Sequence, residues 1–437
     1  MEIYAIIFTI LSIATIGFSF TKPKYGALFY LIYMYLAPYL YIDGYIIYAR
    51  TTAFLFLFFF LIKFSRTFKW ENLKPLLPYV VFLIWNLIFV FNSEQKDDSL
   101  DKWITDVSSL FFTIFLYANM CSDLKSVKLY KWALFIIFCM ITLYGLYLTS
   151  MPGLNPFKML TNPMFGKEFN EAYAAGNSAL SNITELADGR LFGRISSVFD
   201  HPMTYGLNLG FFFVYSLYLL KDHPKILSCV LSVIIAAIIT SGVRTPIAAL
   251  GITVLAIMLY MRNIRYFIWG VAAFLAVIYV VPLISGDAGD FILSIINSDN
   301  SETKGSTISM RMEQMQGCLE IVKEDMLLGK GYGWTNWYNS NYGAHPEAIY
   351  FESLIYCILV NTGILGFIAW GWFAFKYYRY AQKHISDNTL RMAVLALLFY
   401  FLVYCCITGD FNIKNMLVFF MIMIGINMEN KRKLQSH

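Results

Sequence analysis

The chain has 437 residues, of which 58% are hydrophobic and 14% charged, and its formal net charge is +5. A single soluble core would leave too much of this apolar surface uncovered, which excludes an ordinary soluble globular protein. The composition predicts an all-α polytopic membrane protein with about 12 or 13 transmembrane helices.

Apolar runs long enough to cross a bilayer as helices recur along most of the chain. The first run has no Lys or Arg before it and no small-residue cleavage site after it, so we expect a retained span and not a signal peptide. The runs lie near residues 2–20, 26–42, 47–63, 76–92, 103–120, 130–149, 203–220, 226–240, 245–261, 266–284, 347–375, 391–408 and 412–428.

The loops between these runs alternate in charge. One side carries 20 of the 33 Lys and Arg residues but only five of the 28 acids. The positive-inside rule makes this side cytoplasmic, so the long polar stretch after the tenth run faces outward. The modest net charge therefore reflects topology, and no nucleic-acid partner is expected. The basic loops cover residues 22–24, 63–74, 125–131, 221–225, 262–265, 376–391 and 431–433.

Four parts of the chain follow from this topology. We expect an N-terminal transmembrane scaffold at 1–150, transmembrane helices with the first outer loop and the Arg244 turn at 151–284, a large outer catalytic loop at 285–346, and C-terminal transmembrane helices at 347–437. Of the seven cysteines, Cys318 alone lies in an outer loop, so no outer disulfide pair is expected.

Two helix starts on the outer side carry basic residues. Arg194 precedes His201-Pro202, and proline is favoured in a first helical turn, so a span begins there. In the later turn, Thr245 is a candidate N-cap and Pro246 a first helical residue, which puts Arg244 at a helix N-terminus. Arg244 is there either part of an anion site with free backbone N–H groups or an arginine that snorkels to the headgroup level.

The large outer loop is predicted to contain an amphipathic helix, with Arg311 in its first turn and its end at Gly329. Its apolar face would lie on the membrane surface or on the bundle. That face is formed by residues three or four positions apart: Met312, Met315, Leu319, Val322 and Met326.

A glycine-rich turn follows this helix, and its backbone at Gly331 and Tyr332 could approach a ligand. The turn lacks the Lys-Ser or Lys-Thr ending of a phosphate loop, and no strand precedes it. His345-Pro346 then opens the next span, with Glu347 and Glu352 about one turn apart near its outer end.

The charge distribution indicates chemistry at the outer membrane surface. No predicted span carries a charge near its centre, where ion or proton pathways place them. Arginines beside helix N-termini suit a diphosphate, so an anionic lipid head group is the implied ligand. A nearby histidine could take a proton from an attacking hydroxyl. No metal or cofactor is expected, because Asp287 and Asp290 flank a turn that we expect to be solvated.

Residues 190–370 resemble the O-antigen ligase and polymerase group of integral-membrane glycosyltransferases. Two positions differ from the group's pattern: Pro346 replaces a frequent Asn, and Asn361 replaces an acid. The resemblance rests on the order of several short motifs: Arg194 with His201-Pro202-Met203-Thr204-Tyr205-Gly206, Ser241-Gly242-Val243-Arg244-Thr245, Arg311, Leu328-Gly329-Lys330-Gly331-Tyr332-Gly333, His345 and Gly363-Ile364-Leu365-Gly366.

This resemblance implies transfer of an oligosaccharide from a polyprenyl-diphosphate carrier to a sugar hydroxyl of a glycan acceptor, with inversion and without a metal. The reaction would occur in the bacterial cytoplasmic membrane, at its outer face, among membrane lipid. Arg244 and Arg311 would hold the diphosphate, and His345 would orient or deprotonate the acceptor. The resemblance places the other expected substrate contacts at Arg194, His201, Gly331, Tyr332, Glu347 and Glu352.

Three alternatives remain open at this point. A polymerase of O-antigen, capsule or exopolysaccharide repeat units is favoured over an O-antigen ligase that attaches the glycan to a lipopolysaccharide lipid A core or to protein. A transporter of the same lipid-linked glycans would need a charged cavity that reaches the cytoplasmic half, which the uncharged span centres disfavour. An envelope scaffold would leave the clustered outer arginines unexplained.

Overall fold

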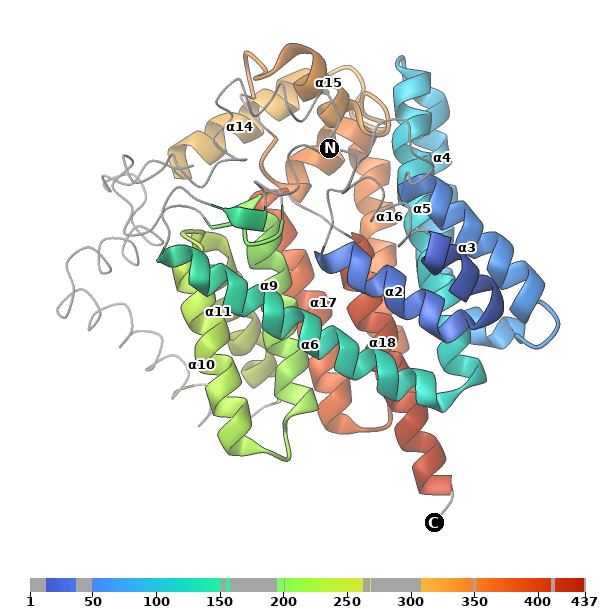
Figure 1. Cartoon of the computed structure of the whole chain (residues 1–437). Helices are drawn as coiled ribbons and strands as arrows, with labels where there is room; N and C mark the ends of the chain where they lie inside the picture. The colour runs from blue at the N-terminus through green and yellow to red at the C-terminus, as the bar shows by residue number, and fades with distance from the viewer. Residues whose placement is uncertain are drawn as a thin grey trace.

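The computed structural model describes residues 13–36, 49–150, 155–157, 195–199, 201–261, 268, 308–348, 351–409 and 413–435. Over these residues the chain forms helices and no strand (Figure 1), which confirms the all-α fold class. The helices are α2 (Pro23–Leu36), α3 (Ala49–Phe64), the short 3-10 helix η1 (Trp70–Leu73), α4 (Leu77–Asn92), α5 (Lys96–Ser122), α6 (Leu124–Thr149), α9 (Pro202–Leu219), α10 (Pro224–Thr240), α11 (Arg244–Tyr260), α14 (Ile308–Ile321), α15 (Trp334–Tyr342), α16 (Leu354–His384), α17 (Asn388–Thr408) and α18 (Ile413–Gln435).

Four of these helices, α5, α6, α16 and α17, are long and apolar enough to cross a membrane. Four shorter apolar segments accompany them, in α3, α4, α10 and α11. Each predicted apolar run that falls on described residues coincides with a helix, which supports a polytopic membrane protein. The run at 266–284 lies outside the described residues apart from residue 268.

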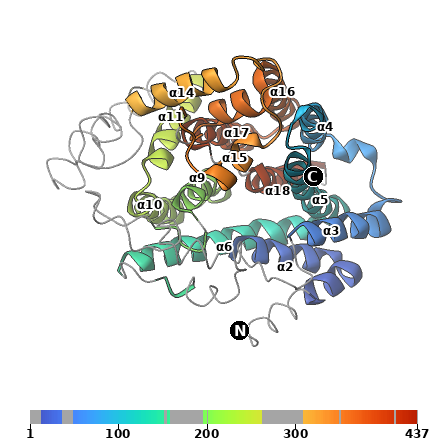
Figure 2. The ribbon, with the colours of Figure 1, turned by 90° about the horizontal axis from the view of Figure 1, so that it is seen from above.

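The middle of the bundle is α18. Every residue from Asn415 to Asn427 is buried, as expected for a helix that is apolar on all sides and packed by protein rather than lipid. Helices α5, α6, α9 and α17 pack around it. Seen from above, α9 to α11 lie on one side of α18 and α3 to α5 on the other (Figure 2).

The outer surface of the bundle is apolar where α6 crosses it. Five large side chains three or four residues apart are 39–58% exposed on one stripe of this helix. Such a continuous apolar stripe is suited to lipid and would be costly in water. The stripe consists of Trp132, Ile136, Met140, Leu143 and Tyr147.

The basic loops meet at one end of the bundle, as their shared side in the sequence predicts. Lys131 Nζ pairs with Glu429 at 2.9 Å and joins α6 to the end of α18. Lys221 pairs with Asp387 at 3.5 Å and joins the α9–α10 loop to the α16–α17 loop. Helices α14 and α15 lie at the opposite end (Figure 1).

Candidate functional site

Helix α16 is broken at Gly363, and the outer loop is attached at the break. Gly363 has φ +58° and ψ −154°, a conformation that is open almost only to glycine. At the break, the amides of residues 364 and 365 do not bond the carbonyls of residues 360 and 361, as they would in a regular helix. These two amides and two carbonyls form hydrogen bonds with the outer loop instead. Lys330 and Gly331 donate to the carbonyls of Val360 and Asn361 at 2.7 and 3.0 Å. Met326 and Leu327 accept from Ile364 and Leu365 at 3.0 and 3.2 Å.

The glycines of this turn bring its backbone against the protein itself. A Cβ at Gly329 would lie 2.6 Å from the amide nitrogen of Thr362 on α16, and one at Gly331 would meet Ser93 at the end of α4. Tyr332 then reaches α5, where its hydroxyl donates to Asp106 at 2.7 Å. The turn therefore ties α4, α5 and α16 together, and this packing accounts for its glycines.

Helix α14 is shorter than predicted. It ends at Ile321, eight residues before Gly329. Gln314 and Cys318 are fully buried, whereas Met312 is 60% exposed. The reason is Gly317, where a Cβ would collide with the backbone of Glu347 and Ala348. The face of α14 that carries this glycine can therefore pack closely against the backbone of these two residues.

Arg311 on α14 and Glu352 form an ion pair, with Arg311 Nη2 3.3 Å from Glu352 Oε2. The same guanidinium donates to the backbone carbonyl of Glu352. Tyr356 fixes the helix at this point because its hydroxyl donates to the Arg311 carbonyl at 2.8 Å. Both charged side chains keep about a quarter of their surface exposed, at 25% and 29%. The sequence predicted the two residues separately, and the structure brings them together.

His345 lies in an aromatic cluster a few residues before Glu352. Its ring centroid is 4.6 Å from Tyr338, 6.2 Å from Trp334 and 6.1 Å from Phe351. The backbone N–H of Glu347 donates to His345 Nδ1 at 3.2 Å, so the neutral ring carries its proton on Nε2. Burial lowers the pKa of His345 from 6.5, and the Glu347 carboxylate opposes that shift.

The predicted helix start at His345-Pro346 is wrong. Residues 346–348 form a turn, and α16 begins at Leu354, where Ser353 Oγ accepts from the Ile355 amide at 3.2 Å. The same hydroxyl donates to the Cys406 carbonyl on α17 at 2.7 Å. Because a side-chain cap satisfies an otherwise free helical amide, Ser353 determines the start, and the segment before it can fold over α14.

This environment predicts a pH dependence of activity. Below its pKa, His345 gains a proton on Nδ1 and loses the bond from the Glu347 amide, so we expect activity to fall at a pH below 6.5. Glu347→Gln removes the negative charge that favours the protonated ring, so it should move this acid limb to lower pH. The pH profile of the transfer rate measures the shift. Glu324→Gln, at an exposed acid, is the control. An acid limb of the pH profile that stays in place or moves to higher pH in Glu347→Gln would contradict this prediction.

The second group of predicted residues lies at the first turns of α9 and α11. His201 is the N-cap of α9, and its Nδ1 accepts from the Met203 amide at 3.1 Å, which confirms the helix start at Pro202. Arg244 is the first residue of α11, and Val243 is the N-cap in place of the predicted Thr245. Arg194 lies outside the described residues.

The outer end of α17 packs against both groups. Tyr404 donates to the Met203 carbonyl at 2.6 Å beside the His201 cap. Five residues later, a Cβ at Gly409 would lie 2.9 Å from the Phe351 carbonyl oxygen and from the Ser353 amide nitrogen. The start of α9 and the segment that carries His345 and Glu352 therefore both pack against the outer end of α17.

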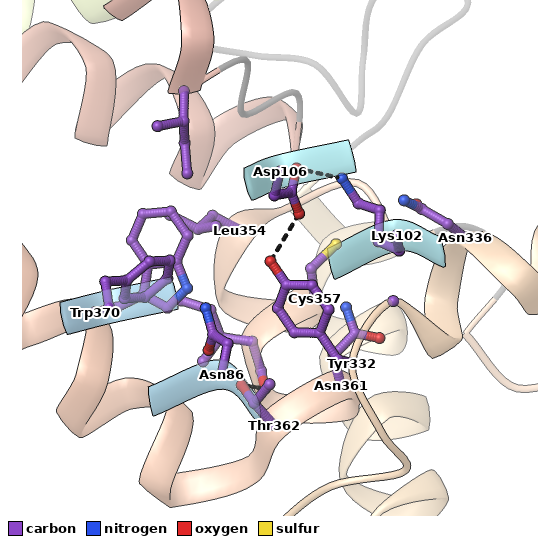
Figure 3. Close-up of a pocket in the computed structure, with 14 residues that line it drawn as sticks. Asn86, Lys102, Asp106, Tyr332, Asn336, Leu354, Cys357, Asn361, Thr362 and Trp370 are labelled. Carbon is purple, nitrogen blue, oxygen red and sulfur yellow. Dashed lines mark hydrogen bonds and ion pairs between the residues drawn. The ribbon is translucent and has the colours of Figure 1, made fainter. Parts of the chain in front are cut away.

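A pocket lies beside this cluster, between α4, α5, α15 and the start of α16 (Figure 3). Its polar lining includes Asp106, which pairs with Lys102 at 2.9 Å and accepts from Tyr332. The sequence did not predict the pocket. No local pattern could have found it, because its walls come from α4, α5, α15, α16 and α18, which span more than 300 residues of the chain.

Among the described residues, no group of three or more His, Cys, Asp or Glu side chains could hold a metal ion.

One comparison with known proteins gives a match. Residues 227–371 match the family model described as O-Antigen ligase, and no curated protein matches the chain. The matched segment runs from α10 to the middle of α16 and contains Arg244, Arg311, His345, Glu347 and Glu352. Over this segment the chain is similar to the O-antigen ligase family, and its long apolar helices are those of a membrane protein.

Proposed function

We propose that the protein transfers an oligosaccharide from a polyprenyl-diphosphate carrier to a hydroxyl of a glycan acceptor, on the outer face of the bacterial cytoplasmic membrane. In the form that we favour, the acceptor is a second lipid-linked repeat unit, and the product is a longer O-antigen, capsule or exopolysaccharide chain. Attachment to a lipid A core sugar or to a protein would instead make the enzyme a ligase.

The observation that supports this proposal most strongly is the pairing of Arg311 with Glu352 on the segment that also holds His345. A guanidinium with a quarter of its surface exposed can donate to phosphate oxygens in a fork. Its carboxylate partner fixes the orientation of that fork. Arg244 adds a second guanidinium at a helix N-terminus, where backbone N–H groups also favour an anion.

The chemical step is a displacement at the anomeric carbon of the donor. The acceptor oxygen forms a bond to that carbon on the face opposite the diphosphate, and the carbon–oxygen bond to the diphosphate breaks with its electron pair. The configuration therefore inverts, and the arginines stabilise the charge that develops on the leaving diphosphate. The hydroxyl proton passes to the released diphosphate, directly or through His345.

His345 serves this step first as a hydrogen-bond donor. With Nδ1 occupied by the Glu347 amide, Nε2–H is the group available to orient a substrate oxygen. A proton-accepting role requires the ring to release that amide. Glu352 would position the acceptor through the Arg311 pair, with Arg194 and His201 as further contacts.

Product size in reconstituted membranes tests this function. Purified protein in lipid vesicles receives polyprenyl-diphosphate oligosaccharide without added metal, and the glycans are separated by size. A ladder of multiples of the repeat unit would support a polymerase, and a single addition that requires an outside acceptor would support a ligase. Glycan that crosses the vesicle membrane without any change in length would contradict both and indicate a transporter.

A further inference from the structure

The pocket beside the His345 cluster has an unusual balance of polar and apolar walls. It is open to solvent, and the space among its lining atoms together with that solvent is about 530 Å³. Phe82 and Trp370 are among its apolar lining residues. The polar lining consists of Asn86, Lys102, Asp106, Tyr332, Asn336, Asn361 and Thr362.

Asn86 is the observation that points to a ligand. Its side chain is 2% exposed, and its Nδ2 group has no hydrogen-bond partner. A buried donor without a partner is costly, roughly 1–3 kcal/mol, and is rare in folded proteins. Since Asn86 lines the pocket (Figure 3), an oxygen of a bound molecule would supply the missing acceptor.

The charges in the pocket favour a neutral ligand. Among the described residues, Lys102 and Asp106 are its only charged lining residues, and they pair with each other at 2.9 Å. Asp106 is held further by the Tyr332 hydroxyl, so its oxygens are fixed acceptors for hydroxyl groups. A diphosphate would find no net positive charge in this pair.

Helix α15 connects the pocket to the cluster. Gly333 and Asn336, at its start, line the pocket, while Trp334 and Tyr338 pack on the His345 ring. Leu354 also lines the pocket, two residues after Glu352. The pocket and the His345 cluster therefore share α15 and the segment that leads into α16.

We propose that this pocket is a carbohydrate subsite that holds a neutral sugar residue of the glycan, apart from the diphosphate, with Asn86 Nδ2 and Asp106 bonding its hydroxyls. The inference rests on the proposed function for the class of substrate. It adds a specificity-determining site in which α4 and α5, outside the segment matched to the family, face residues of that segment. Trp370 and Phe82 would pack against the apolar face of the sugar ring.

Binding of the free glycan tests the subsite separately from catalysis. The probe is the repeat-unit oligosaccharide released from its lipid carrier, titrated into the full chain in lipid nanodiscs by calorimetry. Asn86→Leu removes a donor that bonds nothing in the protein, so its thermal stability should equal or exceed that of the wild type. We expect its oligosaccharide Kd and its KM for the glycan to rise roughly tenfold, with kcat nearly unchanged.

Two further variants complete the test. Asn336→Ala alters an exposed residue at the mouth of the pocket and should raise the KM in the same direction, even if Asn86→Leu folds poorly. Asn119→Leu, a buried amide on α5 that bonds the Phe115 carbonyl at 2.9 Å and does not line the pocket, should bind like the wild type.

The outcomes separate this subsite from the proposed function. Wild-type binding and KM in both Asn86→Leu and Asn336→Ala would overturn the subsite and leave the transferase intact. Competition between inorganic pyrophosphate and the oligosaccharide for the pocket would overturn the assignment of a neutral ligand. A wild-type protein that neither binds nor transfers the glycan would overturn the proposed function together with the subsite.

Discussion

Arg311→Ala is expected to abolish glycan transfer, with a loss of roughly 100-fold or more, and Arg244→Ala should do the same. Each charged hydrogen bond to a phosphate contributes about 1.5–3 kcal/mol, and a guanidinium can make two at once. Two such bonds correspond to at least two powers of ten in rate. Arg311→Lys keeps the charge but loses the fork, so its rate should lie between those of the wild type and Arg311→Ala.

The control for the arginines is Lys323→Ala. Lys323 is a cation of the same outer segment, is 72% exposed, and pairs only with Glu320 in this structure at 3.4 Å. Its removal should leave transfer unchanged, since exposed ion pairs contribute little. Membrane insertion and thermal stability are measured for every variant. Full activity of both Arg244→Ala and Arg311→Ala would show that these side chains do not bind the diphosphate.

Gly363→Ala is expected to detach the outer loop from α16. The strained backbone alone costs a non-glycine residue about 1–3 kcal/mol, and the added Cβ would lie 2.5–2.7 Å from the carbonyl groups of Met326 and Leu327. Those carbonyls are the acceptors that hold the loop. We expect faster protease cleavage between residues 322 and 333, a lower apparent Tm, and a transfer rate reduced roughly 100-fold by the displaced site.

Gly371→Ala is the matched control for that variant. Gly371 lies on the same helix and has no atom within 4 Å of a built Cβ. Alanine in a helix interior is favoured over glycine by about 0.5–1 kcal/mol, so Gly371→Ala should be as stable as the wild type or more stable. If Gly363→Ala resists protease cleavage of the outer loop and transfers glycan as well as the wild type, the break in α16 at Gly363 is not needed.

The sequence predicted the helices well, because apolar runs of membrane length have few alternatives. The basic loops also meet at one end, as their charges predicted, through pairs such as Lys131 with Glu429. These features depend on local composition and on the membrane, and both can be read without any knowledge of tertiary contacts.

The outer loop was predicted less well, because backbone contacts determine its structure. Met312 and Leu319 stay exposed, as an apolar face on the membrane surface allows, while Gly317 approaches the Glu347 backbone. Pro346 suggested a helix start, yet the Ser353 cap placed the start at Leu354. The approach of Gly317 has no signal in the local sequence, whereas Ser353 is a favoured N-cap residue that the prediction passed over.

The candidate site was predicted in part. The sequence selected Arg311, His345 and Glu352 individually, and the structure joins Arg311 to Glu352 and encloses His345 in aromatic side chains. The pocket could not be predicted, since Asn86 and Asp106 become neighbours only when α4 and α5 pack against the turn that carries Tyr332.

The most direct test of the central claim is the release of the lipid diphosphate carrier during transfer. Wild-type protein and Arg311→Ala are reconstituted with polyprenyl-diphosphate oligosaccharide and acceptor, and free carrier and joined glycan are measured in the same samples. The account predicts one carrier diphosphate released for each glycosidic bond formed by the wild type, and neither product from Arg311→Ala. Glycan moved or bound by the wild type without release of the carrier would contradict it.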